Sequence, residues 1–575
     1  MKSKIIWGTA LLLYSIIMID NVNSQSITIE RYDIVVSEIM ADPTPPIGLP
    51  AVEYFELHNR LPVPCHLQNW TIRIGNSTKD LPAITLDSMG YALVIAEKYR
   101  EDYAESVPNL YTISSLSLTD AGQTLILYNA DNEVVHTVSY RKSWHEEPVK
   151  QEGGWSLEMI DEALPNAGQD NWASSVSPLG GTPGLPNSVA ASIGDGIPPE
   201  MERVTMIDSV TLRVFFSEPV CPDLPIPSEL FSIDPNIPIF SVNEVPPFFN
   251  ALNLHLSESP IPGRIHTLTL FGPLPDYAGN ETPTNSTIPF GIPSPPGPKD
   301  LLINEVLTHP FSGTEADFIE LFNKSSHIID LKDVKIGSNG DTIPQKAVVA
   351  VSSGMQLMPG DLCALCKNKR QTTDQYYCPA WRQLVQCDSL PAYAASEGVV
   401  FVTDIALRTI DRLQYTEDMH YPHLVSTEGV SLERLSTDRP TQDADNWYSA
   451  SFTVGYATPG YANSQHLEEI ADAELGIYPD VISPNNDGFN DYAEICLNFP
   501  TPENRVTINI FNNRGCLVNH LVNNELCGND ACFRWEGLDD NMCRLPSGIY
   551  VALIQYWNEQ GKSRRMRKTI SIARW

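Results

Sequence analysis

A pattern of four sequence blocks occurs twice in this chain, and it restricts the folds open to most of it. The first copy contains VVSEIMADP (35–43), EYFELHN (53–59), WSLEMIDEALPNAGQDNW (155–172) and TPGLPNS (182–188). The second contains LINEVLTHP (302–310), DFIELFN (317–323), VSLERLSTDRPTQDADNW (430–447) and TPGYANS (458–464). In both copies the third block places a tryptophan 14 residues after a glutamate, Glu158 to Trp172 and Glu433 to Trp447. Because four blocks recur in one order, we interpret them as a duplicated domain.

Composition and periodicity predict an all-β protein. The chain has 46 Pro and 34 Gly among 575 residues, and few of its runs have helical period. Residues 124–140, TLILYNADNEVVHTVSY, alternate apolar and polar side chains around a tight turn at Asp131-Asn132. We therefore expect tandem immunoglobulin-like β-sandwich domains joined by Pro-rich linkers. IPSPPGPKD (292–300) is predicted to be one such stiff linker.

The duplicated blocks resemble the lamin tail domain, an immunoglobulin-like β-sandwich found in nuclear lamins and in secreted bacterial proteins. Its opening Ser-Glu or Asn-Glu pair is matched by Ser37-Glu38 and Asn304-Glu305. The strand that follows is matched at residues 53–57 and 317–321. The resemblance implies lamin tail domains at 25–189 and 298–465, the second with a cysteine-containing insertion, and says little about function.

The segment between the repeats, residues 190–297, resembles the bacterial Ig-like domain of S-layer and surface proteins. It contains GDGIPP (194–199), FFSEPV (215–220) and DYAGN (276–280). The resemblance implies a module that spaces or presents other domains.

The last module, residues 475–575, follows a charged linker at 466–474. It contains SPNNDGFND (483–491), INIFNNRG (508–515), WEG (535–537) and LPSGIYVALI (545–554). These blocks resemble the gliding-motility-associated C-terminal domain, a targeting domain of the type IX secretion system, and are similar to the Ig-like domain of flagellar hook-capping proteins. The sequence departs from the family at NNRG, where NRWG is frequent, and at its final SIARW. The resemblance implies type IX secretion machinery as a partner, in a Bacteroidetes-type bacterium.

Residues 1–24 are predicted to be a secretory signal peptide. Lys2 and Lys4 precede an apolar run, and Val22 and Ser24 precede the cleavage site. The alternative is a membrane anchor, although the run is short for a bilayer span, and no other transmembrane segment is predicted. We expect a secreted or outer-membrane surface protein that passes through the periplasm. A net charge of −34 disfavours nucleic acid as a partner.

One loop offers oxygen ligands at the spacing of a calcium site. Ser483, Asn485, Asp487, Gly488 and Glu494 occupy positions 1, 3, 5, 6 and 12 of an EF-hand-like loop. Asn485, Asp487 and Glu494 are therefore candidate metal ligands, and calcium is the candidate cofactor at this loop. The alternative is a turn rich in side-chain-to-backbone hydrogen bonds.

Four cysteines in the second repeat, Cys363, Cys366, Cys378 and Cys387, predict either two disulfides of undetermined pairing or a zinc site. An exported chain favours the disulfides. The last module has an odd number of cysteines, so at least one is free or pairs outside the module: Cys496, Cys516, Cys527, Cys532 and Cys543.

No catalytic motif is found, and we expect no enzyme activity. The carboxylate pairs Glu38/Glu56 and Glu305/Glu320 lie on neighbouring predicted strands, where two carboxylates can perform acid–base chemistry. Their flanking residues are instead the fold signature of the family. His420 and His423 lack an evident third metal ligand, and the repeated Asp-Asn-Trp triplets at 170–172 and 445–447 are interpreted as structural.

The combined prediction is a non-catalytic exported protein with structural, adhesive or ligand-presenting modules and an unknown extracellular protein or glycan as partner. The alternative is an accessory or hydrolytic protein acting on extracellular polysaccharide or protein. A basic end runs through Lys562, Arg564, Arg565, Arg567, Lys568 and Arg574. It is either a face read by the export machinery or a charged edge strand that resists aggregation. Asp-Ser/Thr-apolar triplets at 87–89, 208–210, 341–343 and 388–390 resemble O-glycosylation sites of Bacteroidetes.

Overall fold

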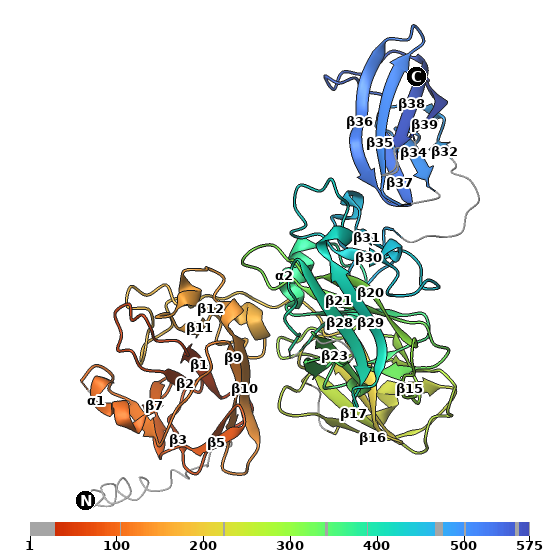
Figure 1. The fold of residues 1–575 in the computed structure, drawn as a ribbon. Helices are drawn as coiled ribbons and strands as arrows, with labels where there is room; N and C mark the ends of the chain where they lie inside the picture. Colours follow the sequence, from red (N-terminus) through yellow and green to blue (C-terminus); the bar gives the residue numbers. More distant parts are fainter. Residues whose placement is uncertain are drawn as a thin grey trace, which may run out of the picture. The chain divides into compact units, whose positions relative to one another are not determined.

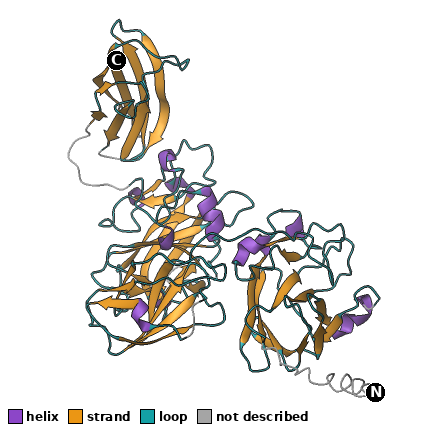
Figure 2. Ribbon diagram, turned by 180° about the vertical axis from the view of Figure 1, so that it is seen from behind, coloured by secondary structure: helices purple, strands orange, loops and turns teal. Residues whose placement is uncertain are grey.

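A computed structural model describes residues 29–573, apart from Ala104, 222–224, 340–342, Asp388, 466–474, 500–501 and 558–562. It divides into two compact units, Met1–Gly196 with Pro246–Phe248, and Ile197–Val245 with Phe249–Trp575. Nearly all regular structure is β, in many small sheets with few short helices (Figures 1 and 2). The predicted all-β class is confirmed. The predicted signal peptide and the 466–474 linker lie outside the described residues.

The first repeat is built from two main sheets with strand orders β12-β11-β1-β2-β7-β8 and β10-β9-β4-β5, and a small β3-β6 pair. Its elements are β1 (Ile34–Met40), β2 (Tyr54–Asn59), β3 (Cys65–Leu67), β4 (Thr71–Ile74), β5 (Ser77–Asp80), β6 (Ile84–Leu86), β7 (Tyr91–Ala96), α1 (Arg100–Tyr103), β8 (Leu110–Ile113), β9 (Gly122–Tyr128), β10 (Val134–Arg141), β11 (Leu157–Met159) and β12 (Trp172–Ser174). Every residue of β1 and β2 is buried, because both strands lie inside the larger sheet.

The second repeat has the same strand order as the first. Its sheets are β27-β26-β21-β20-β30-β31 and β24-β23-β28-β29, with a small β22-β25 pair. The elements are β20 (Leu301–Leu307), β21 (Phe318–Asn323), β22 (Ile329–Asp330), β23 (Val334–Ser338), β24 (Lys346–Val349), β25 (Gln356–Leu357), β26 (Leu362–Cys366), α2 (Lys369–Gln375), β27 (Leu384–Gln386), β28 (Glu397–Asp404), β29 (Thr409–Thr416), β30 (Leu432–Arg434) and β31 (Trp447–Ser449). The two sets of four blocks thus form equivalent strands and loops, as a duplicated domain requires.

The segment between the repeats is a smaller sandwich with its own core. Its sheets are β13-β14-β17-β16 and β15-β18-β19, and the core includes Leu212, Val214, Leu254 and Phe290. The strands are β13 (Met201–Asp208), β14 (Thr211–Phe216), β15 (Phe231–Asp234), β16 (Ile239–Glu244), β17 (Ala251–Leu256), β18 (His266–Leu270) and β19 (Ser286–Phe290).

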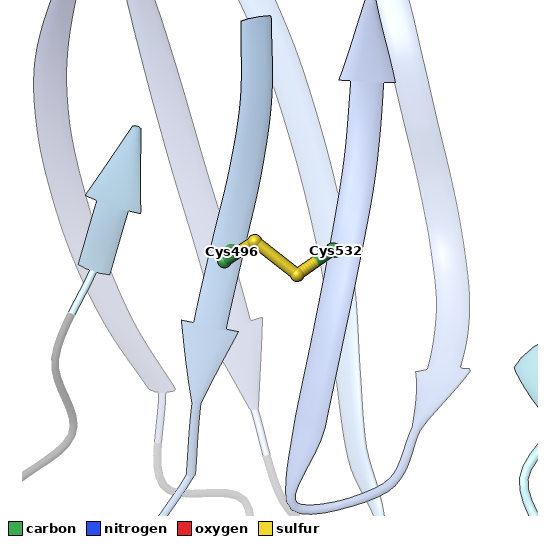
Figure 3. The surroundings of a disulfide bond; sticks show 2 residues. All are labelled: Cys496 and Cys532. Atoms are coloured by element: carbon green, nitrogen blue, oxygen red, sulfur yellow. A yellow bond between two sulfur atoms is a disulfide. The ribbon is translucent and has the colours of Figure 1, made fainter. Parts of the chain in front are cut away.

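The C-terminal module packs a three-stranded sheet, β32-β34-β37, against a five-stranded sheet, β33-β39-β38-β35-β36. Its strands are β32 (Leu475–Tyr478), β33 (Val481–Ile482), β34 (Ala493–Asn498), β35 (Asn504–Asn512), β36 (Leu517–Cys527), β37 (Asp530–Trp535), β38 (Gly548–Trp557) and β39 (Ser563–Ile572). A disulfide joins Cys496 and Cys532, which lie directly opposite each other on β34 and β37 (Figure 3). Cys516 and Cys543 are exposed thiols and Cys527 is a buried one, in agreement with the prediction from the odd cysteine count.

The Pro-rich stretch 292–300, predicted to be a stiff linker, makes hydrogen bonds to the second repeat. The Ser294 amide donates to the Ile328 carbonyl at 2.8 Å, and the Lys299 amide donates to the Ile410 carbonyl at 2.9 Å. Residues of this stretch other than proline keep a backbone N–H, and two of these groups donate hydrogen bonds to the second repeat. The stretch therefore packs on that domain.

Candidate functional site: two buried glutamate triads

The carboxylate pairs noted in the sequence belong to two rows of three glutamates, one in each repeat. In the first, Glu38 of β1 lies directly opposite Glu56 of β2 and Glu158 of β11. In the second, Glu305 lies opposite Glu320 and Glu433. All six side chains are completely buried. We refer to these rows as the first and second glutamate triads.

A β-bulge positions the residue before the central glutamate. The register shifts between Val36 and Glu38 in β1, and between Ile303 and Glu305 in β20. Neighbouring residues of a regular strand point to opposite faces, whereas a bulge reorients one of them. The hydroxyl of Ser37 consequently donates to Glu56 Oε1 at 2.8 Å. The repeated Ser-Glu or Asn-Glu pair is therefore a requirement of this local geometry.

The TPG block supplies hydrogen-bond donors to the first triad. The Thr182 amide donates to Glu38 Oε1 at 2.8 Å, and the Gly184 amide donates to Glu56 Oε2 at 2.5 Å. The Thr182 hydroxyl bonds Glu158 at 3.0 Å, and the Ser188 hydroxyl bonds its other oxygen at 2.7 Å. The three carboxyl groups thus bind residues 182–188, near the end of the domain, to the larger sheet.

The second triad makes the same contacts with the second TPG block. The amides of Thr458 and Gly460 donate to Glu305 and Glu320 at 2.9 and 2.6 Å. The hydroxyl of Thr458 donates to Glu433 at 2.8 Å. The glycine of each block has a positive φ, +80° at Gly184 and +85° at Gly460, which a residue with a side chain rarely adopts. This explains why the block contains glycine at that position.

Burial and repulsion between neighbouring carboxyl groups raise the pKa of Glu38, Glu305 and Glu320. Burial, with a smaller contribution from Glu158, raises the pKa of Glu38 to about 7, although three hydrogen bonds oppose the shift. Burial raises the pKa of Glu320 to about 8 and that of Glu305 well above its ordinary range, with Glu433 adding to both effects. Groups that are sealed from solvent and bonded to a backbone segment have no path to an external substrate. Their geometry therefore favours a role in domain closure over acid–base catalysis.

Sequence reasoning found two glutamates of each triad but not the third, nor the segment that the triad binds. The signal was present, since Glu158, Glu433 and both TPG blocks belong to the repeated pattern. It could not be interpreted because these blocks lie more than 100 residues from the first strand and meet it only in the folded sheet.

The loop predicted as a calcium site is organised around a residue that the prediction omitted. Asp491 accepts the amides of Asn485, Asn486 and Gly488 at 3.1, 2.6 and 2.8 Å. Asp487 accepts the Phe489 amide at 2.8 Å. These bonds are those of the alternative, a turn stabilised by its own side chains.

Glu494, the third candidate ligand, is an exposed residue of β34, opposite Tyr478 in the sheet. The first two candidates, Asn485 and Asp487, bond each other at 2.9 Å. Calcium binding at these three residues stays a prediction.

The four cysteines of the second repeat do not form the two expected disulfides. Cys363, Cys366 and Cys378 are thiols, and the Cys387 thiol donates to the Ala350 carbonyl at 3.1 Å. Cys363 and Cys366 are three residues apart on β26, so they point to opposite faces of the sheet and join different apolar clusters. Burial raises the pKa of Cys366 to about 12. Within the described part of the chain, none of the four belongs to a cluster of three metal-ligating atoms.

The remaining sequence candidates also have structural partners. His420 Nδ1 lies 3.0 Å from the Ser449 hydroxyl, and burial lowers its pKa to about 4, whereas His423 packs against the Tyr421 ring. In the Asp-Asn-Trp triplets, the Asn171 side chain bonds the backbone of Asp161 and Leu164. Trp172 and Trp447 are buried. This agrees with their structural interpretation.

In the basic end, Arg565, Arg567 and Lys568 are exposed on β39. Lys562 and Arg574 lie outside the described residues. Of the four O-glycosylation-like triplets, those at 87–89 and 208–210 are exposed loop or turn segments, and Asp341, Thr342 and Asp388 of the other two are not described. No helix in the described ranges has the length and apolar character needed to cross a membrane.

Comparison with solved structures finds several bacterial proteins, all at low sequence identity. The chain is similar to the N-terminal part of the bacterial S-layer protein SbsC, with 17% identity and a TM-score of 0.16 over 38% of this chain and 44% of that one. It is also similar to latent PorU from Porphyromonas gingivalis, with 11% identity and a TM-score of 0.15 over 78% and 40%. A third similar structure is PorZ, described as an essential surface component of the type IX secretion system of the same bacterium, with 9% identity and a TM-score of 0.14 over 87% and 75%.

The chain spans about half the length of the S-layer chains that it matches. TM-scores this low carry no argument about function. Comparison with curated proteins gave no match.

The C-terminal module gives a specific family match. Residues 476–572 match the CHU_C type IX secretion signal domain. The matched range runs from β32 to the end of β39 and thus includes both sheets of the module. The chain therefore carries a C-terminal module similar to type IX secretion signal domains, which indicates export to the cell surface or secretion.

Proposed function

We propose that this protein is a non-catalytic surface or secreted protein of a Bacteroidetes-type bacterium. Its C-terminal module directs export, and its two lamin-tail-like repeats and the bacterial Ig-like module between them serve structural, adhesive or ligand-presenting roles. The observation that carries the proposal is the match of residues 476–572 to the type IX secretion signal domain.

The absence of catalysis is part of the proposal and is supported by the glutamate triads. A glycoside hydrolase needs two carboxyl groups that reach its substrate, whereas Glu38, Glu56, Glu305 and Glu320 are fully buried and bonded to backbone amides or side chains. The tryptophans support the same view. Of the tryptophans in the described ranges, Trp155, Trp381 and Trp557 are partly buried and the others are buried.

The test is the location and mass of the protein in its host, with and without residues 475–575. The intact chain is expected at the cell surface or in the medium, and the truncated chain in the periplasm. Protease resistance of the truncated chain is the control for folding. Export of a folded truncated chain would contradict the proposal, and the mass of the intact exported protein shows whether the last module is removed.

A further inference from the structure

The first repeat contains a surface pocket that is separate from its glutamate triad. The pocket has a volume of about 410 Å³, and its polar lining residues include Arg60, Tyr91, Asp161 and Glu162. Its apolar lining residues include Ile160 and Pro186. We call it the Glu162 pocket.

A network of polar side chains holds the Glu162 carboxylate. The Tyr91 hydroxyl donates to Glu162 Oε1 at 3.0 Å, and His58 Nε2 lies 3.1 Å from Oε2. The imidazole ring of His58 is 1% exposed and stacks on the Tyr91 ring with a centroid distance of 4.3 Å. The Glu162 side chain itself is 28% exposed. The carboxylate is therefore fixed in position and still reachable from solvent.

The second repeat lacks this network although its strands have the same arrangement. In the first repeat His58 lies opposite Tyr91 across β2 and β7, and the equivalent pair across β21 and β26 is Phe322 and Leu362. Glu162 lies four residues after the third glutamate of its triad, where the second repeat has Thr437. The fold thus accepts apolar residues at both paired positions. A buried histidine beside a carboxylate costs desolvation that an apolar pair avoids, so domain stability gives no reason for the polar network.

The charges around the pocket favour a positively charged ligand. Asp161 and Glu162 line the pocket together with Arg60, and Asp33, outside the lining, also interacts with the Arg60 guanidinium. Burial acts to raise the pKa of Glu162, but His58, Tyr91 and Arg60 outweigh it and hold the pKa below its ordinary value. The carboxylate is therefore charged at neutral pH. One guanidinium leaves the surrounding carboxylates in excess.

We propose that the Glu162 pocket binds an amine or guanidinium group carried on an apolar stem. Glu162 is the counter-ion, and apolar lining residues such as Ile160 and Pro186 contact the stem, as apolar surfaces do with the methylene groups of lysine and arginine. The source of the cation is either a small free amine or a lysine or arginine side chain of a partner protein. The site specifies the chemical class of the partner in the proposed adhesive role. Its biological meaning rests on that role, but the binding itself does not.

The test is calorimetric titration of the purified full chain with ligands of equal stem length. Pentylamine is expected to bind one site per chain with a dissociation constant in the millimolar range or tighter, and 1-pentanol and pentanoate are expected to bind at least tenfold more weakly. Nα-acetyl-lysine methylamide represents the protein source. If it binds as well as pentylamine, the ligand is a side chain, and if only pentylamine binds, the ligand is a free amine.

Two substitutions separate loss of the charge from loss of the fold. Glu162→Gln and Glu162→Thr are both expected to weaken pentylamine binding at least tenfold, and the second introduces the residue that the other repeat tolerates at this position. Glu101→Gln, at an exposed residue of α1, is the matched control and should leave binding unchanged. Equal binding of 1-pentanol, unchanged binding in both folded Glu162 variants, or no binding of any cation would overturn the proposal. The export test does not involve these residues, so the two proposals can fail separately.

Discussion

Replacing Glu38 with Gln tests whether Glu38 is protonated in the folded protein. A raised pKa makes the stability of the native protein depend on pH, and glutamine removes that dependence. Burial raises the pKa of Glu38 from 4.5 to about 7, a shift that corresponds to about 3 kcal/mol. Since the pKa is raised on folding, this stabilisation is fully present below the unfolded pKa and is lost as the pH rises through about 7. Glutamine stays neutral. Its oxygen can accept the bonds from Ser156, Tyr54 and Thr182 that now end at Glu38 Oε1.

Hydrogen exchange of the amides in residues 178–190 of the full chain measures the local opening energy. Variant and native protein are compared at the same pH, so that the intrinsic exchange rate cancels. At pH 5 the two proteins should differ by about 1 kcal/mol or less, and at pH 9 the Glu38→Gln protein should be more stable by about 3 kcal/mol. Glu101→Gln is the matched exposed control. If the difference between Glu38→Gln and native protein is the same at both pH values, Glu38 does not carry a proton in the folded state and the reasoning is refuted.

Three further predictions follow from individual contacts. Asn171→Ala removes three hydrogen bonds that join the loop before β12, and it should lower the unfolding free energy of the first unit by about 2–3 kcal/mol, as measured by urea-dependent hydrogen exchange. Arg434→Met leaves the buried carboxylate of Asp411 without its cation and should cost about 3–5 kcal/mol. The first repeat has Met159 and His136 at the equivalent positions, where His136 accepts the Val36 amide as Asp411 accepts the Ile303 amide. Adding Asp411→His should therefore recover part of this loss in a double-mutant cycle. In maleimide labelling of the folded protein, Cys516 and Cys543 should react at once and the buried thiols only after denaturation, and rapid labelling of the buried thiols would contradict the structure.

The sequence predicts the fold class and the duplication well because both depend on local patterns. Blocks such as SE followed by YFEL fix two neighbouring strands, a bulge and two of three triad glutamates. The TPG contacts could not be predicted, because they join Glu38 to Thr182 across 144 residues. No local periodicity encodes that contact.

Residue type alone does not determine the environment of a residue. Cys363 and Cys366 suggest disulfides in an exported chain, but this prediction is wrong, because their spacing on one strand places the two side chains in separate apolar clusters. The prolines of 292–300 predict a stiff linker, but they do not predict that Ser294 and Lys299 between them bond to the second repeat. The Glu162 pocket could not be predicted, because His58 of β2, Tyr91 of β7 and Glu162, which follows β11, come together only in the folded domain.

Whether the C-terminal module is sufficient for export can be measured directly. Residues 475–575 are fused to a reporter protein that carries a signal peptide and otherwise stays in the periplasm of a Bacteroidetes host. We expect the fusion to reach the cell surface or the medium, and to stay in the periplasm when the type IX secretion machinery is deleted. A stable, folded fusion that remains in the periplasm of the intact host would show that the module is not an export signal.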